Sequence, residues 1–150
     1  MRWLKLLPLL LFFSAPAPDA EAASGKIIKV LPHLLDRDGR HSLSPSLYER
    51  DAYQAFLRKH PDLCSGLRFD VQWKAKRAAG APLLLRLEIR GKEARPVVLE
   101  QTARRDRSYR RWNSLRVDGV SYRKLGEVLA WRATLWEGDR LLAEQKSFLW

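Results

Sequence analysis

Strict alternation of apolar and polar residues in two neighbouring segments is the strongest constraint on the fold. In residues 67–76 every odd position is apolar and every even position is polar. Residues 83–90 follow a similar pattern, with Leu83, Leu85, Leu87 and Ile89 on one side and Arg86, Glu88 and Arg90 on the other. A period of two places successive side chains on opposite faces of a strand, so each segment predicts a strand with one buried face.

Five further segments predict strands, which brings the expected total to about seven. They are residues 26–31, 96–102, 115–117, 127–136 and 140–150. The last two flank Glu137-Gly138-Asp139, which predicts a hairpin, and Asp118-Gly119 is a second turn signal of the hairpin type. Because the apolar residues 148–150 close the last segment, we expect that strand to be packed rather than frayed.

One helix is predicted near residues 45–59. Ser46 and Glu49 have the spacing of a capping box, in which the two residues satisfy the first free N–H groups of a helix. The alternative cap is Ser44, with Pro45 at the first helical position. Apolar residues then recur near helical spacing, and His60 precedes Pro61, a position that disfavours the α conformation and therefore ends the helix.

These elements predict an all-β domain. About seven strands, with turns about every 8–15 residues, are typical of an antiparallel β-sandwich, loosely similar in pattern to immunoglobulin and fibronectin type III domains. The chain has one cysteine, so the immunoglobulin disulfide is missing, and the pattern identifies no family. The alternative is an α+β domain in which the helix of residues 44–59 packs on one sheet.

Residues 1–22 have the organisation of a secretory signal peptide. Arg2 and Lys5 precede an apolar run over residues 6–13, and Ala20-Glu21-Ala22 has the small residues of a cleavage site. The run is under half of the about 20 residues that cross a bilayer as a helix. We therefore expect an exported protein, periplasmic or extracellular, with one domain over residues 23–150 and no transmembrane segment after cleavage. Retention as an uncleaved anchor is the alternative.

The formal net charge of +11 is concentrated in one part of the chain. Twelve basic and five acidic residues lie between Arg86 and Lys124, and residues 104–112 hold five arginines. Guanidinium groups bind phosphate, sulfate and carboxylate, and aromatic rings between them stack on bases or sugars. This segment predicts an anion-binding loop over residues 104–111 and the next residue, made by Arg104, Arg105, Arg107, Tyr109, Arg110, Arg111 and Trp112.

The ligand of such a loop would be an anionic glycan, a lipid headgroup or nucleic acid, of which nucleic acid is not favoured. The alternative is a solvated loop between two strands. Arginine outnumbers lysine 19 to 9 across the chain, which indicates a general bias toward arginine rather than a site.

Catalytic and metal-binding patterns are weak. Cys64 lies four residues after His60, and a thiol hydrolase built on this pair is the catalytic hypothesis. The spacings of His33, His41 and His60 match no common metal motif, so we expect ordinary surface or turn histidines, with no metal and no cofactor. Residues 36–39 resemble a calcium loop but fail its register, and they predict a turn.

The function predicted from these features is that of an exported, non-enzymatic interaction or adaptor module of the cell envelope. Its partner would be an unidentified protein, an anionic polymer or a membrane surface. The two alternatives are an anion-binding protein that uses residues 104–111 and, less favoured, the thiol hydrolase. A fold by itself does not define a function, so a function has to be inferred from the residues of a site.

Overall fold

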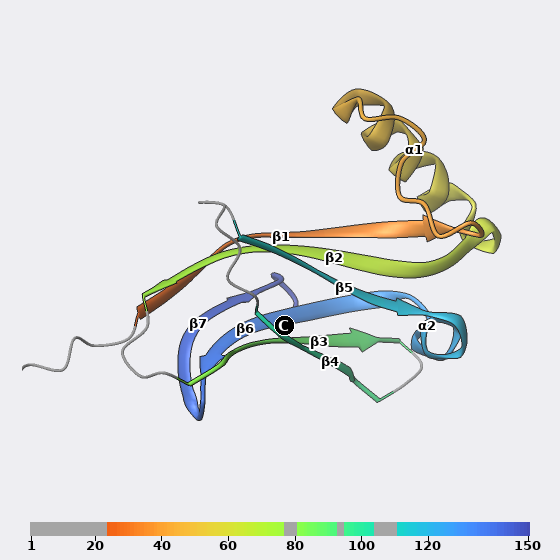
Figure 1. Cartoon of the computed structure of the whole chain (residues 1–150). Helices are drawn as coiled ribbons and strands as arrows, with labels where there is room; N and C mark the ends of the chain where they lie inside the picture. Colours follow the sequence, from red (N-terminus) through yellow and green to blue (C-terminus); the bar gives the residue numbers. More distant parts are fainter. Residues whose placement is uncertain (1–23, 77–80, 93–94, 104–110) are drawn as a thin grey trace, which may run out of the picture.

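The computed structural model describes residues 24–76, 81–92, 95–103 and 111–150. These residues are mainly β, with seven strands in two antiparallel sheets and two short α-helices. The first sheet has the order β1-β2-β5, with β1 (Ser24–Asp36), β2 (Cys64–Lys76) and β5 (Arg111–Asp118). The second has the order β4-β3-β6-β7, with β3 (Leu83–Gly91), β4 (Val97–Thr102), β6 (Val128–Glu137) and β7 (Arg140–Lys146) (Figure 1).

The two sheets share one hydrophobic core. The alternation predicted from the sequence is confirmed, since the odd residues of β2 and β3 point between the sheets and are fully buried: Phe69, Val71, Trp73, Leu85, Leu87 and Ile89. The indole Nε1 of Trp73 donates to Asn113 Oδ1 at 2.7 Å, and Asn113 Nδ2 donates to Gln101 Oε1 at 3.0 Å. A buried N–H needs such a partner, and this relay joins β5 of one sheet to β4 of the other.

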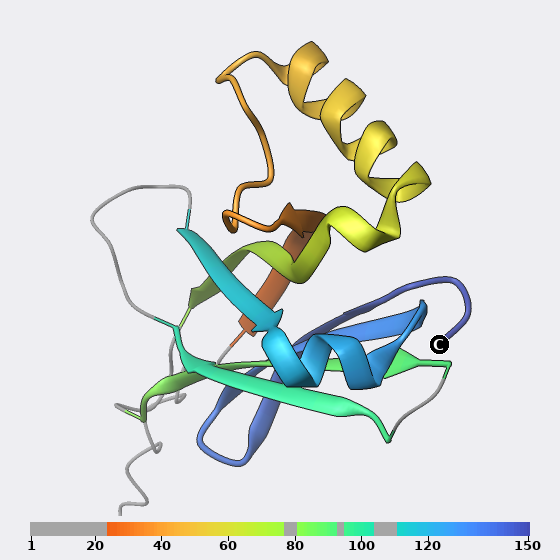
Figure 2. The ribbon, with the colours of Figure 1, turned by 90° about the vertical axis from the view of Figure 1, so that its right-hand side faces the viewer.

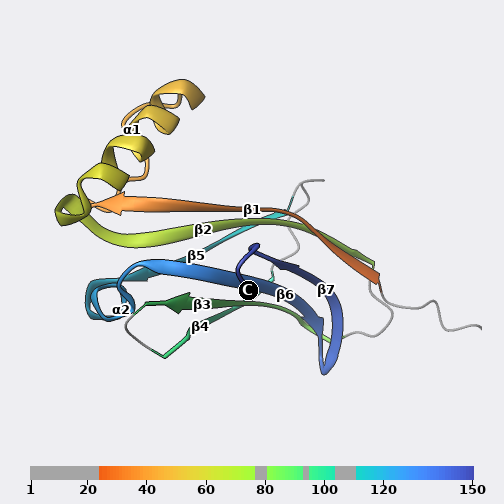
Figure 3. The same ribbon diagram turned by 180° about the vertical axis from the view of Figure 1, so that it is seen from behind.

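On the opposite side of the molecule, β1 lies beside β7 (Figure 3). A Cβ atom added at Gly25 would lie 2.8 Å from the Cβ of Leu142, a separation that real Cβ atoms do not show. The close approach of the two sheets at this edge therefore requires a glycine at position 25.

Helix α1 (Leu47–Lys59) confirms the sequence prediction. Ser46 is the N-cap, its Oγ accepts the Glu49 N–H at 3.5 Å, and the helix ends before Pro61, which begins the short 3₁₀ turn η1 (Pro61–Leu63). Only Gln54 and Leu57 of this helix are buried. The rest of α1 rises from the outer side of the three-stranded sheet, at the C-terminal end of β1 (Figures 1 and 2).

The structure differs from the sequence prediction at two places. Asp118-Gly119 is not a hairpin turn, because Gly119 (φ +54°) begins a second helix, α2 (Gly119–Leu125). The residues after β7 are packed only in part: Phe148 is fully exposed and Leu149 is 69% exposed, whereas Trp150 is half-buried, with the Arg90 guanidinium 3.9 Å from its ring centroid. The predicted turns at residues 36–39 and 137–139 are confirmed. The predicted signal peptide, residues 1–22, lies outside the described residues.

Candidate anion-binding site

The described residues include only two members of the predicted arginine-rich site, Arg111 and Trp112. Arg104, Arg105, Arg107, Tyr109 and Arg110 lie outside the described residues. Arg111 and Trp112 are the first two residues of strand β5, so the predicted loop ends before them. The Arg111 guanidinium lies over the Trp73 ring, 5.2 Å from its centroid, and Nη1 donates to the Ala75 carbonyl at 3.5 Å. Trp112 is 44% exposed on the outer face of the sheet, opposite Gln72.

The pairing of β1 with β2 brings lysines to the same outer face. Lys26 lies directly opposite Lys74, Ser24 lies opposite Lys76, and Lys29 lies opposite Gln72. Directly opposed residues of an antiparallel pair project to the same side, with Cβ atoms about 4.5–5.5 Å apart. Since Trp73 points into the core, Lys74 and its partner Lys26 point to solvent, and both are exposed.

The positive charge of this surface is not balanced by nearby acids. Like charges directly opposite each other in a sheet are destabilising. Among the described residues, no carboxylate lies within 4.0 Å of the side-chain nitrogens of Lys26, Lys29, Lys74 or Arg111. The acid farther along β2, Asp70, is already paired with Arg68 at 2.8 Å.

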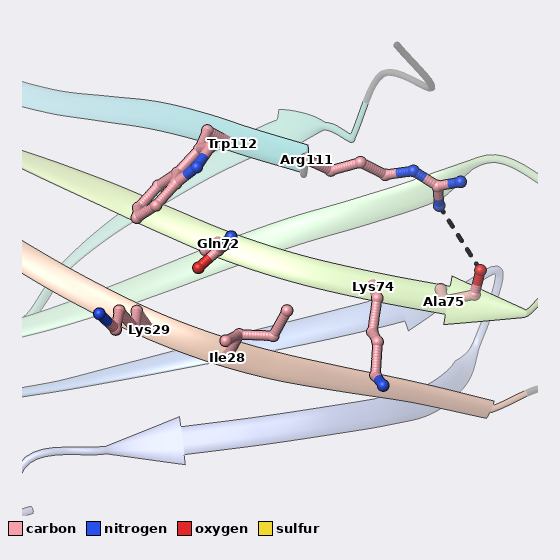
Figure 4. Close-up of a pocket in the computed structure, with 7 residues that line it drawn as sticks. All are labelled: Ile28, Lys29, Gln72, Lys74, Ala75, Arg111 and Trp112. Atoms are coloured by element: carbon pink, nitrogen blue, oxygen red, sulfur yellow. Dashed lines mark hydrogen bonds between the residues drawn. The ribbon is translucent and has the colours of Figure 1, made fainter. Parts of the chain in front are cut away.

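An open depression of about 530 Å³ lies over β1, β2 and β5 beside these lysines (Figure 4). It is lined by Ile28, Lys29, Gln72, Lys74, Ala75, Arg111 and Trp112. A register shift in β1 between Ile27 and Lys29 makes an irregularity at Ile28, which is 40% exposed. A second depression, of about 580 Å³, shares Lys74 and Ala75 and continues past Lys26 to the end of the sheet. The surface therefore combines Lys26, Lys29 and Lys74, none of which has a described carboxylate partner, with two exposed apolar side chains, Ile28 and Trp112.

The half of the outer face nearer to α1 has a different character, because its polar groups are satisfied internally. Asp70 Oδ1 accepts from Arg68 Nε and from Ser114 Oγ, and Asp70 Oδ2 lies 3.6 Å from His33 Nε2. The Ser114 hydroxyl thus binds the carboxylate and not the imidazole. A nucleophile has to contact its base, so this group does not have the arrangement of a catalytic triad.

His33 is buried, so the prediction of an ordinary surface or turn histidine is wrong for this residue. Its ring tilts against that of His41, with centroids 5.2 Å apart. Burial lowers the pKa of His33 below 6.5, and the charges of Arg50 and Arg68 lower it further while Asp70 opposes them. The pKa of His41 is also lowered, mainly by burial. Both imidazoles are therefore neutral at pH 7.

Cys64 and His60 do not form the contact that a catalytic dyad needs. Cys64 Sγ donates to the backbone carbonyls of Leu57 and His60, at 3.5 and 3.7 Å. The His60 ring stacks on Phe56, and its Nδ1 lies 2.9 Å from the Phe56 carbonyl. Burial raises the pKa of the Cys64 thiol, although a hydrogen bond with Tyr122 opposes this. A partly buried thiol with a raised pKa is the opposite of an activated thiolate.

The described residues offer neither a metal centre nor a membrane-spanning helix. No cluster of three or more His, Cys, Asp or Glu side chains in this part of the chain is arranged to hold a metal ion. None of its helices has both the length and the apolar character needed to span a bilayer. The basic surface around Lys26 and Lys74 is therefore the candidate site that the described side chains support best.

No protein-family model, no curated protein and no solved structure matches this chain. The candidate site therefore rests on its own geometry, exposure and charge. Of the residues around it, Arg111 and Trp112 were predicted from the sequence as anion-binding, which stays a prediction, whereas Lys26, Lys29 and Lys74 were not. These three lysines lie at polar positions of two predicted strands, which is the sequence signal that could have found them. That signal shows that they lie together only once the register between the two strands is known.

Proposed function

We propose that this protein is a non-enzymatic binding module and that its ligand is anionic. The observation that carries the proposal is the directly opposed pair Lys26 and Lys74, with Lys29 and Arg111 nearby and no described carboxylate within ion-pair distance. An anion placed between these cations relieves their repulsion. Because it binds the folded chain and not the separated strands, it also stabilises the fold.

The neighbouring apolar side chains narrow the chemistry of the ligand. Ammonium groups act as point charges and accept phosphate, sulfate or carboxylate without a fixed geometry, whereas a guanidinium prefers two parallel hydrogen bonds. Exposed Trp112 and Ile28 lie beside these cations and favour a ligand that carries a flat or apolar part next to its charge. Simple inorganic anions would leave those two side chains unused.

The remaining sequence predictions belong to the same proposal. Two antiparallel sheets around one core support a β-sandwich, and the likeness to immunoglobulin and fibronectin type III domains stays a prediction from the strand pattern. Export to the periplasm or the extracellular space is proposed from residues 1–22. A protein partner stays a hypothesis, and the anionic ligand is the one that the site favours.

The proposal is tested with heparin as a model polyanion, titrated into the purified protein over a salt series. The variant Lys26→Gln/Lys29→Gln/Lys74→Gln removes three charges at the site. The control Arg58→Gln/Lys59→Gln/Arg123→Gln removes three exposed charges on or near the helices. The logarithm of the binding constant should fall linearly with the logarithm of salt concentration, and the site variant should lose at least about tenfold more affinity than the control. Equal losses in both variants would show attraction to net charge alone and reject the site.

A further inference from the structure

The three lysines of the site form a short row rather than a single point, because they occupy two successive outward positions of the paired strands. Along β2, residues 72, 74 and 76 project outward, and outward side chains two residues apart on a strand are separated by about 6.6 Å. Lys26 and Lys29 on β1 lie beside this row, opposite Lys74 and Gln72. The two positions, Lys29 beside Gln72 and Lys26 beside Lys74, are about 6.6 Å apart along the strands. A linear ligand with a charge on successive units fits such a row better than a compact anion does.

The shape of this side of the molecule disfavours a planar ligand. Helix α1 rises above β1 on the same side of the three-stranded sheet as the row (Figures 1 and 2). Tyr48 in its first turn is 84% exposed. A flat bilayer approaching the sheet would meet α1 before it reached Lys74, whereas a narrow chain can lie along the strands.

The number of aromatic residues at the site distinguishes between the two remaining classes of linear polyanion, nucleic acids and acidic polysaccharides. Strands of nucleic acid bind through several aromatic side chains, because each successive base stacks on its own platform. Among the described residues that line the two depressions, Trp112 is the one aromatic residue. One exposed indole beside a row of ammonium groups suits a linear ligand with two kinds of contact. A single ring of the ligand packs on the indole, and its charged substituents extend to the lysines. A sugar ring with carboxylate or sulfate groups has this form.

We infer that the ligand of this site is an acidic polysaccharide, bound along β2 through two or three of its charged sugars. One sugar ring packs on Trp112, and the anionic groups contact Lys26, Lys29 and Lys74. This inference rests on the proposed function and adds the class of ligand to it.

The test compares three probes by calorimetric titration at one salt concentration: a heparin hexasaccharide, inorganic polyphosphate of matched charge and a single-stranded oligonucleotide of about 12 nucleotides. The variants are Trp112→Ala, the conservative Trp112→Phe and the lysine triple variant of the heparin experiment. Because Trp112 is exposed, its replacement leaves the core intact, and a thermal melt of each variant checks this.

We expect Trp112→Ala to weaken hexasaccharide binding by about tenfold, Trp112→Phe to retain most of it, and neither to change polyphosphate binding. The lysine triple variant should lose both ligands. If Trp112→Ala leaves hexasaccharide binding within about twofold, or if the oligonucleotide binds more tightly and depends equally on Trp112, the polysaccharide inference is overturned while anion binding stands. If the lysine triple variant keeps all three ligands, the proposed function fails as well.

Discussion

Gln54 on α1 hydrogen-bonds both backbone groups of Leu34 on β1. Its Oε1 accepts the Leu34 N–H at 2.8 Å, and its Nε2 donates to the Leu34 carbonyl at 2.9 Å and to the His41 carbonyl at 2.9 Å. The side-chain amide thus takes the place of a neighbouring strand for one residue at the open edge of the sheet. With Leu57 as the other buried residue of the helix, this contact attaches α1 to the domain.

Replacement of Gln54 by Leu should destabilise the protein by about 1–3 kcal/mol. Leucine has a similar size but leaves the Leu34 N–H and two carbonyls without their partner, and unpaired groups at a partly buried site cost their lost hydration. Urea unfolding measures the free energy, with the exposed substitution Lys59→Gln as the control. A change below about 0.5 kcal/mol would mean that water replaces the amide at no cost.

Replacement of Lys26 by Glu should stabilise the fold and abolish anion binding at the same time. An acid opposite Lys74 turns a repulsive cross-strand pair into an attractive one, which is expected to raise the unfolding free energy by about 0.2–1 kcal/mol. Urea unfolding and heparin titration on the same sample check both effects. The control Lys92→Glu makes the same change of charge away from the site. Stability and binding that fall together would contradict the electrostatic account of the pair.

Acidification below neutral pH should weaken the protein through His33 and His41. Both pKa values are lowered on folding, above all by burial, so the unfolded chain binds protons more readily than the folded one. Stability is therefore fully present above about pH 6.5 and falls as the pH drops through the folded pKa values. Protonation would place two positive charges on rings whose centroids are 5.2 Å apart. Arg50 and Arg68 already add positive charge near His33, and Asp70 is the acid that opposes it.

Urea midpoints at about pH 7.5 and pH 5 measure this effect. In the variant His33→Gln the decrease between the two values should be smaller, because one of the two groups no longer titrates. An equal decrease in the variant would assign the pH dependence to other residues.

Cys64 should react slowly with iodoacetamide in the folded protein. Alkylation needs the thiolate, and burial raises the pKa of this thiol, so the reaction should accelerate strongly when urea unfolds the chain. Mass spectrometry follows the modification over time. The variant Cys64→Ser should keep full heparin affinity, since Cys64 does not line the basic depression. Rapid labelling of the folded protein would instead revive the thiol hydrolase hypothesis.

The elements that the sequence predicted correctly depend on short-range signals. The alternation in residues 67–76 is a property of one strand half buried in a core, and the cap at Ser46 involves only the first turn of α1. Asp118-Gly119 also gave a local signal, but it was misread. A glycine with positive φ commonly reverses the chain in a hairpin, whereas Gly119 (φ +54°) instead stands at the start of α2.

The candidate site depends on long-range pairing, which single residues do not reveal. Lys26 and Lys74 belong to strands that are far apart in the chain, and a shift of one residue in their register would turn one of them toward the other face. The irregularity at Ile28 causes such a shift within β1 itself. Nothing in the local sequence around residues 26–29 marks this position, so the cluster is apparent only in the folded structure.

Strand β1 forms one edge of its sheet, and its lysines have a consequence for self-association. Unpaired strand edges recruit further chains, and proteins prevent this with charged residues, especially lysine, and with proline on the edge strand. Lys26, Lys29 and Pro32 supply both along β1, next to the amide of Gln54. The cations that would attract a polyanion are therefore the ones that keep two copies of the chain apart, so a substitution at either lysine changes solubility together with affinity.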